Sequence, residues 1–154
     1  METRCIRKED LQHLKAIINT TNLFPSAALD EMMSNYFDSQ EKQAIWLTST
    51  IEHTPVGLLY CAPERLTDGT FNIYLIAVHS DFRNKGIGKE LMANIEKLVK
   101  EKQGRILIVE TSSSTEYEAT RGFYKKINYT HEATIREFYS SGEDKIVFWK
   151  RLVS

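Results

Sequence analysis

The strongest structural signal in the chain is the segment Ile76-Ala77-Val78-His79-Ser80-Asp81-Phe82-Arg83-Asn84-Lys85-Gly86-Ile87-Gly88-Lys89. An apolar run ends at Val78, a turn with two glycines follows, and apolar residues then recur at helical spacing. The segment therefore predicts a strand, a turn and the start of a helix. Free N–H groups at a helix start bind anions, and glycines let a ligand approach the backbone closely. With basic residues beside them, the expected ligand is a phosphate or diphosphate.

Two common phosphate-binding motifs do not fit this turn. A P-loop requires Ser or Thr after its Gly-Lys pair, whereas Glu90 follows Gly88 and Lys89, and Arg83 stands where the first glycine belongs. A dinucleotide-binding fingerprint requires a third glycine at the position of Leu91. A plainer interpretation stays open, in which the basic residues are a solvated helix start and the glycines serve only the turn.

Outward from this segment, the hydrophobic pattern predicts a mixed α/β chain. Strands are expected at residues 3–7, 44–48, 56–61, 71–78 and 106–109, with a final hairpin within residues 129–152. Helices are expected at residues 9–19, from a cap at Ser26 to Phe37, from Ile87 to Val99, and at residues 116–126. Two helices, a meander, strand–helix–strand–helix and a hairpin make a mixed α/β arrangement.

Length and composition limit the class of protein. The 154 residues fit one domain, residues 1–154, and 42% apolar with 27% charged residues is ordinary for a globular protein. A formal net charge of −1 gives no indication of nucleic-acid binding. No apolar run approaches the roughly 18 residues of a membrane span, and the start does not resemble a secretory signal. Cys5 and Cys61 are too few for a disulfide framework, so we expect a cytoplasmic protein with reduced thiols.

Residues 83–88, Arg-Asn-Lys-Gly-Ile-Gly, resemble the Gln/Arg-x-x-Gly-x-Gly/Ala acetyl-coenzyme A signature of the GNAT N-acetyltransferase superfamily. Residues 123–129, Phe-Tyr-Lys-Lys-Ile-Asn-Tyr, resemble the superfamily's Phe-Tyr-x-x-x-Gly-Phe segment, with Asn128 at the glycine position, where it can still adopt a positive φ. The order of expected elements is also similar over nearly the whole chain. The resemblance implies a mixed, mostly antiparallel sheet of about seven strands flanked by about four helices, with acetyl-coenzyme A as co-substrate.

The same resemblance implies where the co-substrate binds. Its diphosphate would be held by the backbone amides of Arg83, Asn84, Lys85, Gly86, Ile87, Gly88 and Lys89. Its pantetheine would pair with the backbone of Ile76, Ala77 and Val78 as an added strand, and an amide near Val78 would polarise the thioester carbonyl. Tyr117 and Thr120 are further candidate cofactor-binding residues, although many members carry Asn at the position of Tyr117.

Tyr124 is the candidate general acid. Its ordinary pKa near 10 lies close to the 8.5 of a thiol, so it could share a proton with the departing sulfur. Thr115 and Glu118 form a Thr-x-x-Glu capping box, which predicts a helix start near Thr115. Tyr117, Thr120 and Tyr124 would then share one helix face. The alternative is that Tyr124 only packs the helix against the sheet.

Glu110 is the candidate general base, because it follows the apolar run of residues 106–109 at an expected strand end. Alternatively it is an ordinary carboxylate bonded to Ser112 or Ser113, and water could relay the proton. Glu64 and Asp68 could instead bind a cationic acceptor, and His79 is a weaker candidate base. No His, Cys, Asp or Glu cluster has metal-ligand spacing, so no metal is expected.

The sequence therefore predicts a transferase, an N-acetyltransferase that moves an acetyl group from acetyl-coenzyme A to a primary amine by direct attack in a ternary complex. A covalent acyl-enzyme is not expected, because neither cysteine falls in the motifs. One alternative is a non-catalytic coenzyme A-binding regulatory module. Another is a kinase-like phosphate-binding protein, against which Glu90 argues. The acceptor amine stays unidentified, no nucleic-acid or membrane partner is expected, and exposed strand edges permit a homodimer.

Overall fold

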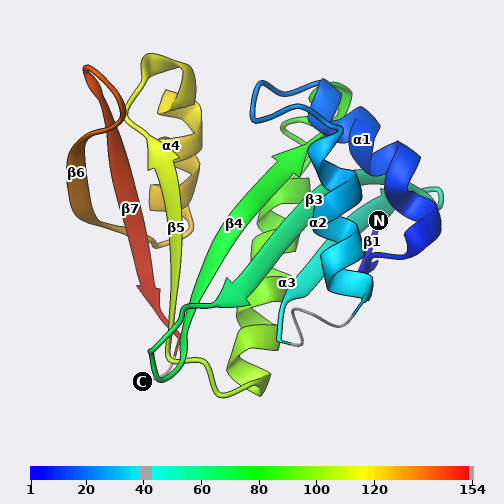
Figure 1. Cartoon of the computed structure of the whole chain (residues 1–154), viewed down its shortest axis with the longest axis horizontal. Coiled ribbons are helices and arrows are strands. Elements are labelled where there is room, and N and C mark those ends of the chain that lie inside the picture. Colours follow the sequence, from blue (N-terminus) through cyan, green and yellow to red (C-terminus); the bar gives the residue numbers. More distant parts are fainter. Residues whose placement is uncertain (39–42, 153–154) are drawn as a thin grey trace.

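One mixed β-sheet in the order β1-β2-β3-β4-β5-β7-β6 is the frame of the protein (Figure 1). The computed structural model describes residues 1–38 and 43–152. Its seven strands are β1 (Glu2–Cys5), β2 (Ile45–Ile51), β3 (Thr54–Pro63), β4 (Thr70–Val78), β5 (Ile106–Ser112), β6 (Thr130–Ser140) and β7 (Glu143–Arg151). In this described part, β4 and β5 are the one parallel pair, and every other pair of neighbours is antiparallel. The expected mixed, mostly antiparallel sheet is confirmed.

Helices cover both faces of this sheet. The described residues form four α-helices, α1 (Leu11–Asn19), α2 (Ala28–Phe37), α3 (Ile87–Glu101) and α4 (Glu118–Lys126). They also form short 3-10 helices at Lys8–Asp10, Ser80–Phe82 and Thr115–Tyr117. One core cluster joins α1 and α2 to one face of the sheet, and a second joins α3 and α4 to the other. The four expected helices are therefore confirmed, with α1 and α2 in front of α3 in Figure 1.

Helix α3 shows how the sequence pattern produces this packing. Most of its large apolar residues recur three and four positions apart, and five of them are buried: Ile87, Leu91, Met92, Ile95 and Val99. Burial of one such side chain stabilises a fold by about 1.5–3 kcal/mol, so this stripe fixes the helix firmly on the sheet. The position of the helix start, which matters for the site below, follows from that packing.

Strands β4 and β5 separate halfway along their length. They pair only from Thr70 opposite Ile106 to Ile73 opposite Val109. On its other side β4 carries one extra residue, Tyr74, because Leu75 and Ile73 lie opposite consecutive residues of β3. Such a bulge bends a strand and increases its twist. Beyond it β4 stays with β3 and β5 stays with β7, and we call the resulting opening between residues 75–78 and 110–112 the fork (Figure 1).

Three local predictions were wrong in detail. Strand β5 does not end at residue 109, because Glu110 and the next two residues pair with β7. The Thr115 capping box does not form, since the hydroxyl of Ser114 accepts the N–H of Glu116 and starts a 3-10 turn, so α4 begins only at Glu118. Ser26 does not cap α2, because it lies in a turn whose backbone carbonyls accept the first N–H groups of the helix.

Candidate functional site

The turn between β4 and α3 contains two residues with a left-handed backbone. Gly86 stands at the N-cap of α3 with φ 82°, and Asn84 also has a positive φ of 61°. A non-glycine residue in the left-handed region costs roughly 1–2 kcal/mol. A Cβ on Gly86 would meet no atom within 4 Å, so glycine is favoured here by its positive φ and not by lack of space. The space above it is open to a ligand.

The backbone N–H groups of residues 83–89, which we call the amide row, have no acceptor in the described part of the chain. The first helical bond runs from the N–H of Glu90 to the carbonyl of Gly86, at 3.0 Å. Residues 83–86 are exposed, so these donors face solvent. The row also carries Arg83, Lys85 and Lys89, none of which forms an ion pair with the described residues. Unpaired donors beside unneutralised cations form an anion-binding surface.

Two close contacts hold the amide row in place. A Cβ on Gly57 of β3 would lie 2.8 Å from Cγ2 of Ile87, so this glycine lets the start of α3 approach the sheet. On the other side, the ring of Phe123 in α4 would lie 3.5 Å from a Cβ on Gly88. The row is therefore fixed between the sheet and α4.

Strand β4 leads from the fork to the amide row with one edge unpaired. The N–H of His79 donates to the carbonyl of Val56 in β3 at 2.9 Å. The direction of the backbone N–H and C=O groups alternates from one strand residue to the next. The groups of Ala77 therefore also point toward β3, whereas those of Ile76 and Val78 point into the fork. Of the three residues expected to pair with pantetheine, Ile76 and Val78 thus have free backbone groups and Ala77 does not.

Tyr124 lies in α4, beneath the point where the strands part. Its ring centroid is 5.3 Å from that of Phe148, and Phe148 pairs with Val109, the last β5 residue joined to β4. The residue is only 2% exposed, and no described residue hydrogen-bonds its hydroxyl. Burial raises the pKa of Tyr124 well above its usual value. The expected near match to the pKa of a thiol therefore does not hold in the free protein, where Tyr124 keeps its proton.

Tyr117 and Thr120 lie on the same side of the fork as Tyr124. Both are half-buried, but Tyr117 precedes α4 because the helix begins one residue later. Burial raises the pKa of Tyr117, and the negative charges of Glu116 and Glu143 raise it further.

Glu110 lies at the fork with partners that its sequence neighbourhood did not predict. Its Oε1 is 3.1 Å from Nζ of Lys145, and Nδ2 of Asn72 lies 3.5 Å from its Oε2. The same amide group donates to Oε1 of Glu64 at 2.9 Å, and the hydroxyl of Tyr74 also bonds Glu64. Glu110 therefore belongs to a polar cluster that joins β4, β5, β7 and the loop after β3.

The other candidates for polar roles lie elsewhere. Ser112 bonds Glu143, and Ser113 accepts the N–H of Asp144, so neither serine is a partner of Glu110. The Nδ1 atom of His79 accepts the N–H of Asp81 at 3.1 Å and stabilises the turn before the amide row. The carbonyl of Asp68 accepts from Arg105.

Sequence reasoning missed three members of the fork cluster: Asn72, Tyr74 and Lys145. A signal for one was present, since Asn72 stands in an otherwise apolar strand and is buried. The positions of Tyr74 and Lys145 depend on the bulge and on strand pairing, which no local pattern reveals.

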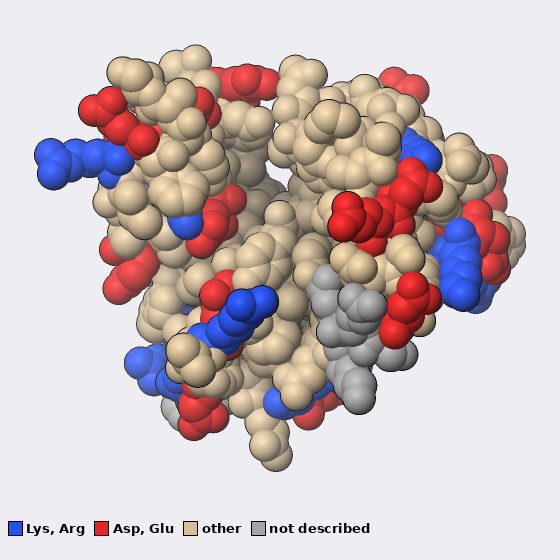
Figure 2. All heavy atoms as spheres, viewed as in Figure 1, with Lys and Arg blue, Asp and Glu red and all other residues tan. Residues whose placement is uncertain are grey.

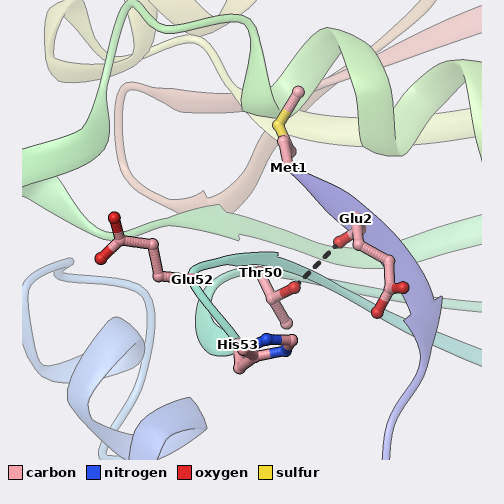
Figure 3. A pocket seen from close by; sticks show the side chains of 5 residues that line it. All are labelled: Met1, Glu2, Thr50, Glu52 and His53. Carbon is pink, nitrogen blue, oxygen red and sulfur yellow. Dashed lines mark hydrogen bonds between the residues drawn. The ribbon is translucent and has the colours of Figure 1, made fainter.

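Two surface hollows are lined by residues outside the fork. One of about 250 Å³ is lined by Met1, Glu2, Thr50, Glu52 and His53, and in Figure 3 Glu52 points away from the others. Another of about 450 Å³ lies between α1, the turn joining β2 to β3, and His79. Within the described residues, no group of three or more His, Cys, Asp or Glu could hold a metal, and no helix is long and apolar enough to span a membrane.

The comparisons with known proteins agree with this geometry. A family model described as acetyltransferase (GNAT) domain matches residues 42–131. A solved structure from Desulfovibrio desulfuricans, assigned to the GNAT family of acetyltransferases, is 25% identical, covers 99% of each chain and has a TM-score of 0.91. A search of the curated proteins found no match.

Two further solved structures are similar in fold. An N-acetyltransferase from Staphylococcus aureus Mu50 is 22% identical over 99% of this chain and 98% of its own, with a TM-score of 0.83. An aminoglycoside 6'-N-acetyltransferase solved with coenzyme A is 16% identical over 100% and 98%, with a TM-score of 0.79. At these identities the likeness shows the fold alone.

Proposed function

The chain belongs to the GNAT acetyltransferase family, and from that premise we propose that it moves the acetyl group of acetyl-coenzyme A to a primary amine. The transfer is direct, within a ternary complex, and residues 1–154 form one catalytic domain. The observation that supports this most strongly is the amide row, whose unpaired donors adjoin the open edge of β4.

The amide row would bind the diphosphate of the co-substrate. The helix dipole contributes only about 0.3–2 kcal/mol to such binding, so the backbone N–H groups and the three basic side chains supply most of it. Residues 75–78 extend roughly 13 Å along the fork at the usual rise of a strand. The extended pantetheine of the co-substrate, which carries amide groups, can therefore pair with Val78 and Ile76 and bring the acetyl group to Glu110.

The chemistry requires three groups from this chain. The amine nitrogen attacks the thioester carbonyl, a C–N bond forms and the C–S bond breaks. We assign the N–H of Val78 to the developing oxyanion and the hydroxyl of Tyr124 to the departing sulfur. Glu110, which forms an ion pair with Lys145, accepts the proton of the amine directly or through water. Without such a base, deprotonation of an amine with a pKa near 10.4 costs about 4.6 kcal/mol at pH 7.

A binding and turnover comparison tests the proposal. Acetyl-coenzyme A at about 100 times its Kd should stabilise the fold by about 2.7 kcal/mol, and ATP with Mg²⁺ should add little. Thiol release should then require both acetyl-coenzyme A and an amine. Stabilisation by acetyl-coenzyme A without turnover on any amine would favour the non-catalytic module. Stronger stabilisation by ATP with Mg²⁺ than by acetyl-coenzyme A would exclude both the acetyltransferase and that module.

A further inference from the structure

We propose that the acceptor is an amine that carries a second positive charge, as diamines, polyamines and amino sugars do. This inference rests on the proposed function, because it concerns the acceptor side of the fork. The surface that would select such an amine consists of three carboxylates and three exposed aromatic rings, which we call the acidic mouth: Glu64, Glu110, Glu143, Tyr74, Phe138 and Tyr139.

The carboxylates of the acidic mouth are linked across the sheet. The amide of Asn72 donates to Glu64 at 2.9 Å and lies 3.5 Å from Glu110, so one small group contacts both acids. Glu143 bonds Ser112, which shares a sheet face with Glu110 two residues away. Three separate elements thus direct negative charge to one place.

Most of this charge is not neutralised. Among the described residues, Lys145 pairs with Glu110, whereas Glu64 and Glu143 are bonded only to neutral amide and hydroxyl groups. The nearby guanidinium of Arg121 donates to the backbone carbonyls of residues 112 and 114. In Figure 2, acidic side chains flank the hollow between the β5–β7 part of the molecule and the remainder. The surface therefore keeps a negative charge that favours cations.

Asn72 provides an independent indication of a donor-rich ligand. The residue is 2% exposed, and its Oδ1 has no hydrogen-bond donor in the described chain. The amide that bridges two carboxylates therefore leaves one buried acceptor unused, and reaching it requires the side chains around it to move. An ammonium group has three N–H donors and no acceptor, so it matches this combination of an amide oxygen and carboxylates.

The chain itself contains an example of the ammonium binding that we propose. The Nζ atom of Lys145 lies 4.2 Å from the ring centroid of Phe138 and 3.1 Å from Glu110. A cation between an aromatic face and a carboxylate is a favourable arrangement. The exposed rings of Tyr74 and Tyr139 offer similar faces to a second ammonium. An acceptor with its own carboxylate would instead place like charges together.

Three acceptors of one length test the inference. Diaminobutane carries two ammonium groups, butylamine carries one, and aminobutanoate replaces the second with a carboxylate. We expect kcat/KM to be about tenfold higher for diaminobutane than for butylamine, and about tenfold lower for aminobutanoate than for butylamine. Both ratios should become smaller at high salt, which screens the charges. Spermidine and an aminoglycoside then distinguish linear from cyclic polycations. Equal or reversed ranking of the three acceptors overturns the inference.

A matched pair of variants locates the effect. Glu64→Gln preserves the shape and the acceptor for Tyr74 but removes the charge, so the preference for the diamine should fall about fivefold or more. Glu101→Gln, at the far end of α3, should leave it unchanged. Amines acetylated without charge preference would refute this inference and leave the proposed function standing. No acetylation of any amine would refute both.

Discussion

Tyr124 is enclosed by aromatic rings, yet in the proposed reaction its hydroxyl forms a hydrogen bond to the sulfur of coenzyme A. The rings of Phe123, Tyr129 and Phe148 lie with centroids 5.3–6.2 Å away. Burial raises the pKa of Tyr124, so the hydroxyl remains protonated throughout the neutral range. Such a group stabilises a departing thiolate by donating a hydrogen bond, and it becomes a proton donor only as the sulfur gains charge.

Replacing Tyr124 with Phe should lower kcat by about tenfold or more, because the hydrogen bond to the sulfur is lost. The Kd of acetyl-coenzyme A should stay within about twofold, because the ring packing is kept. Tyr129→Phe is the matched control. It removes a hydrogen bond to Glu96 of 2.9 Å, which should cost about 1 kcal/mol of stability but leave kcat unchanged. An unaltered kcat in Tyr124→Phe would remove this residue from the reaction.

The two cysteines should differ sharply in reactivity. Burial raises the pKa of Cys61 to about 12, whereas Cys5 is exposed. Since the thiolate is the reactive form, a thiol reagent at about pH 8.5 should modify one thiol in the folded protein and two in denaturant. Cys5→Ser should abolish the fast reaction.

Because folding raises the pKa of Cys61, the contribution of this thiol to stability is complete below about pH 8.5 and declines as the pH rises toward 12. Two fast-reacting thiols in the folded protein would contradict the burial of Cys61.

At the scale of elements, the open edge of β4 should respond to ligand residue by residue. Ile76 and Val78 point their N–H groups into the fork, while Ala77 points toward β3. Amide hydrogen exchange followed by NMR should be fast at Ile76 and Val78 in the free protein and slow with coenzyme A bound. Ala77 should be protected in both states. Equal protection of all three residues without ligand would show that the edge is already covered.

The helix start is a second feature that can be tested at this scale. Gly86 and Gly142 have φ of 82° and 80°, and a Cβ on either would meet no atom within 4 Å. Valine at either position should therefore cost a similar amount of stability, roughly 1–2 kcal/mol. Only Gly86→Val should raise the KM for acetyl-coenzyme A, by about tenfold, because only Gly86 shapes the amide row. Equal KM values in the two variants would argue against that row.

The sequence predicts the elements and the amide row because both depend on local patterns. Hydrophobic spacing marks α3, and the glycines with their basic neighbours mark the turn before it. Asn128 has the positive φ of 73° that its place in the second motif requires. The bulge at Tyr74 could not be predicted, because it exists only in the register between β3 and β4. The ion pair between Glu110 and Lys145 likewise depends on how β5 meets β7.

At the scale of the whole molecule, the fork divides the sheet but not the core. The larger core cluster includes Leu47 of β2, Leu91 of α3 and Phe148 of β7, so it spans both sides of the fork. Side chains that share one core lose their contacts together, which makes unfolding cooperative. The two halves should therefore act as one unit even though β4 and β5 pair over only part of their length.

The two tryptophans report on this unit from opposite sides. Trp46 lies in β2 against the α1 and α2 core, and Trp149 lies in β7. In Trp149→Phe the fluorescence of Trp46 should follow the same urea transition as far-UV circular dichroism, and in Trp46→Phe the fluorescence of Trp149 should do so as well. Saturating acetyl-coenzyme A should shift both signals of each variant together, because one folded state binds it. Transitions that separate within either variant would contradict the proposal that residues 1–154 form one domain.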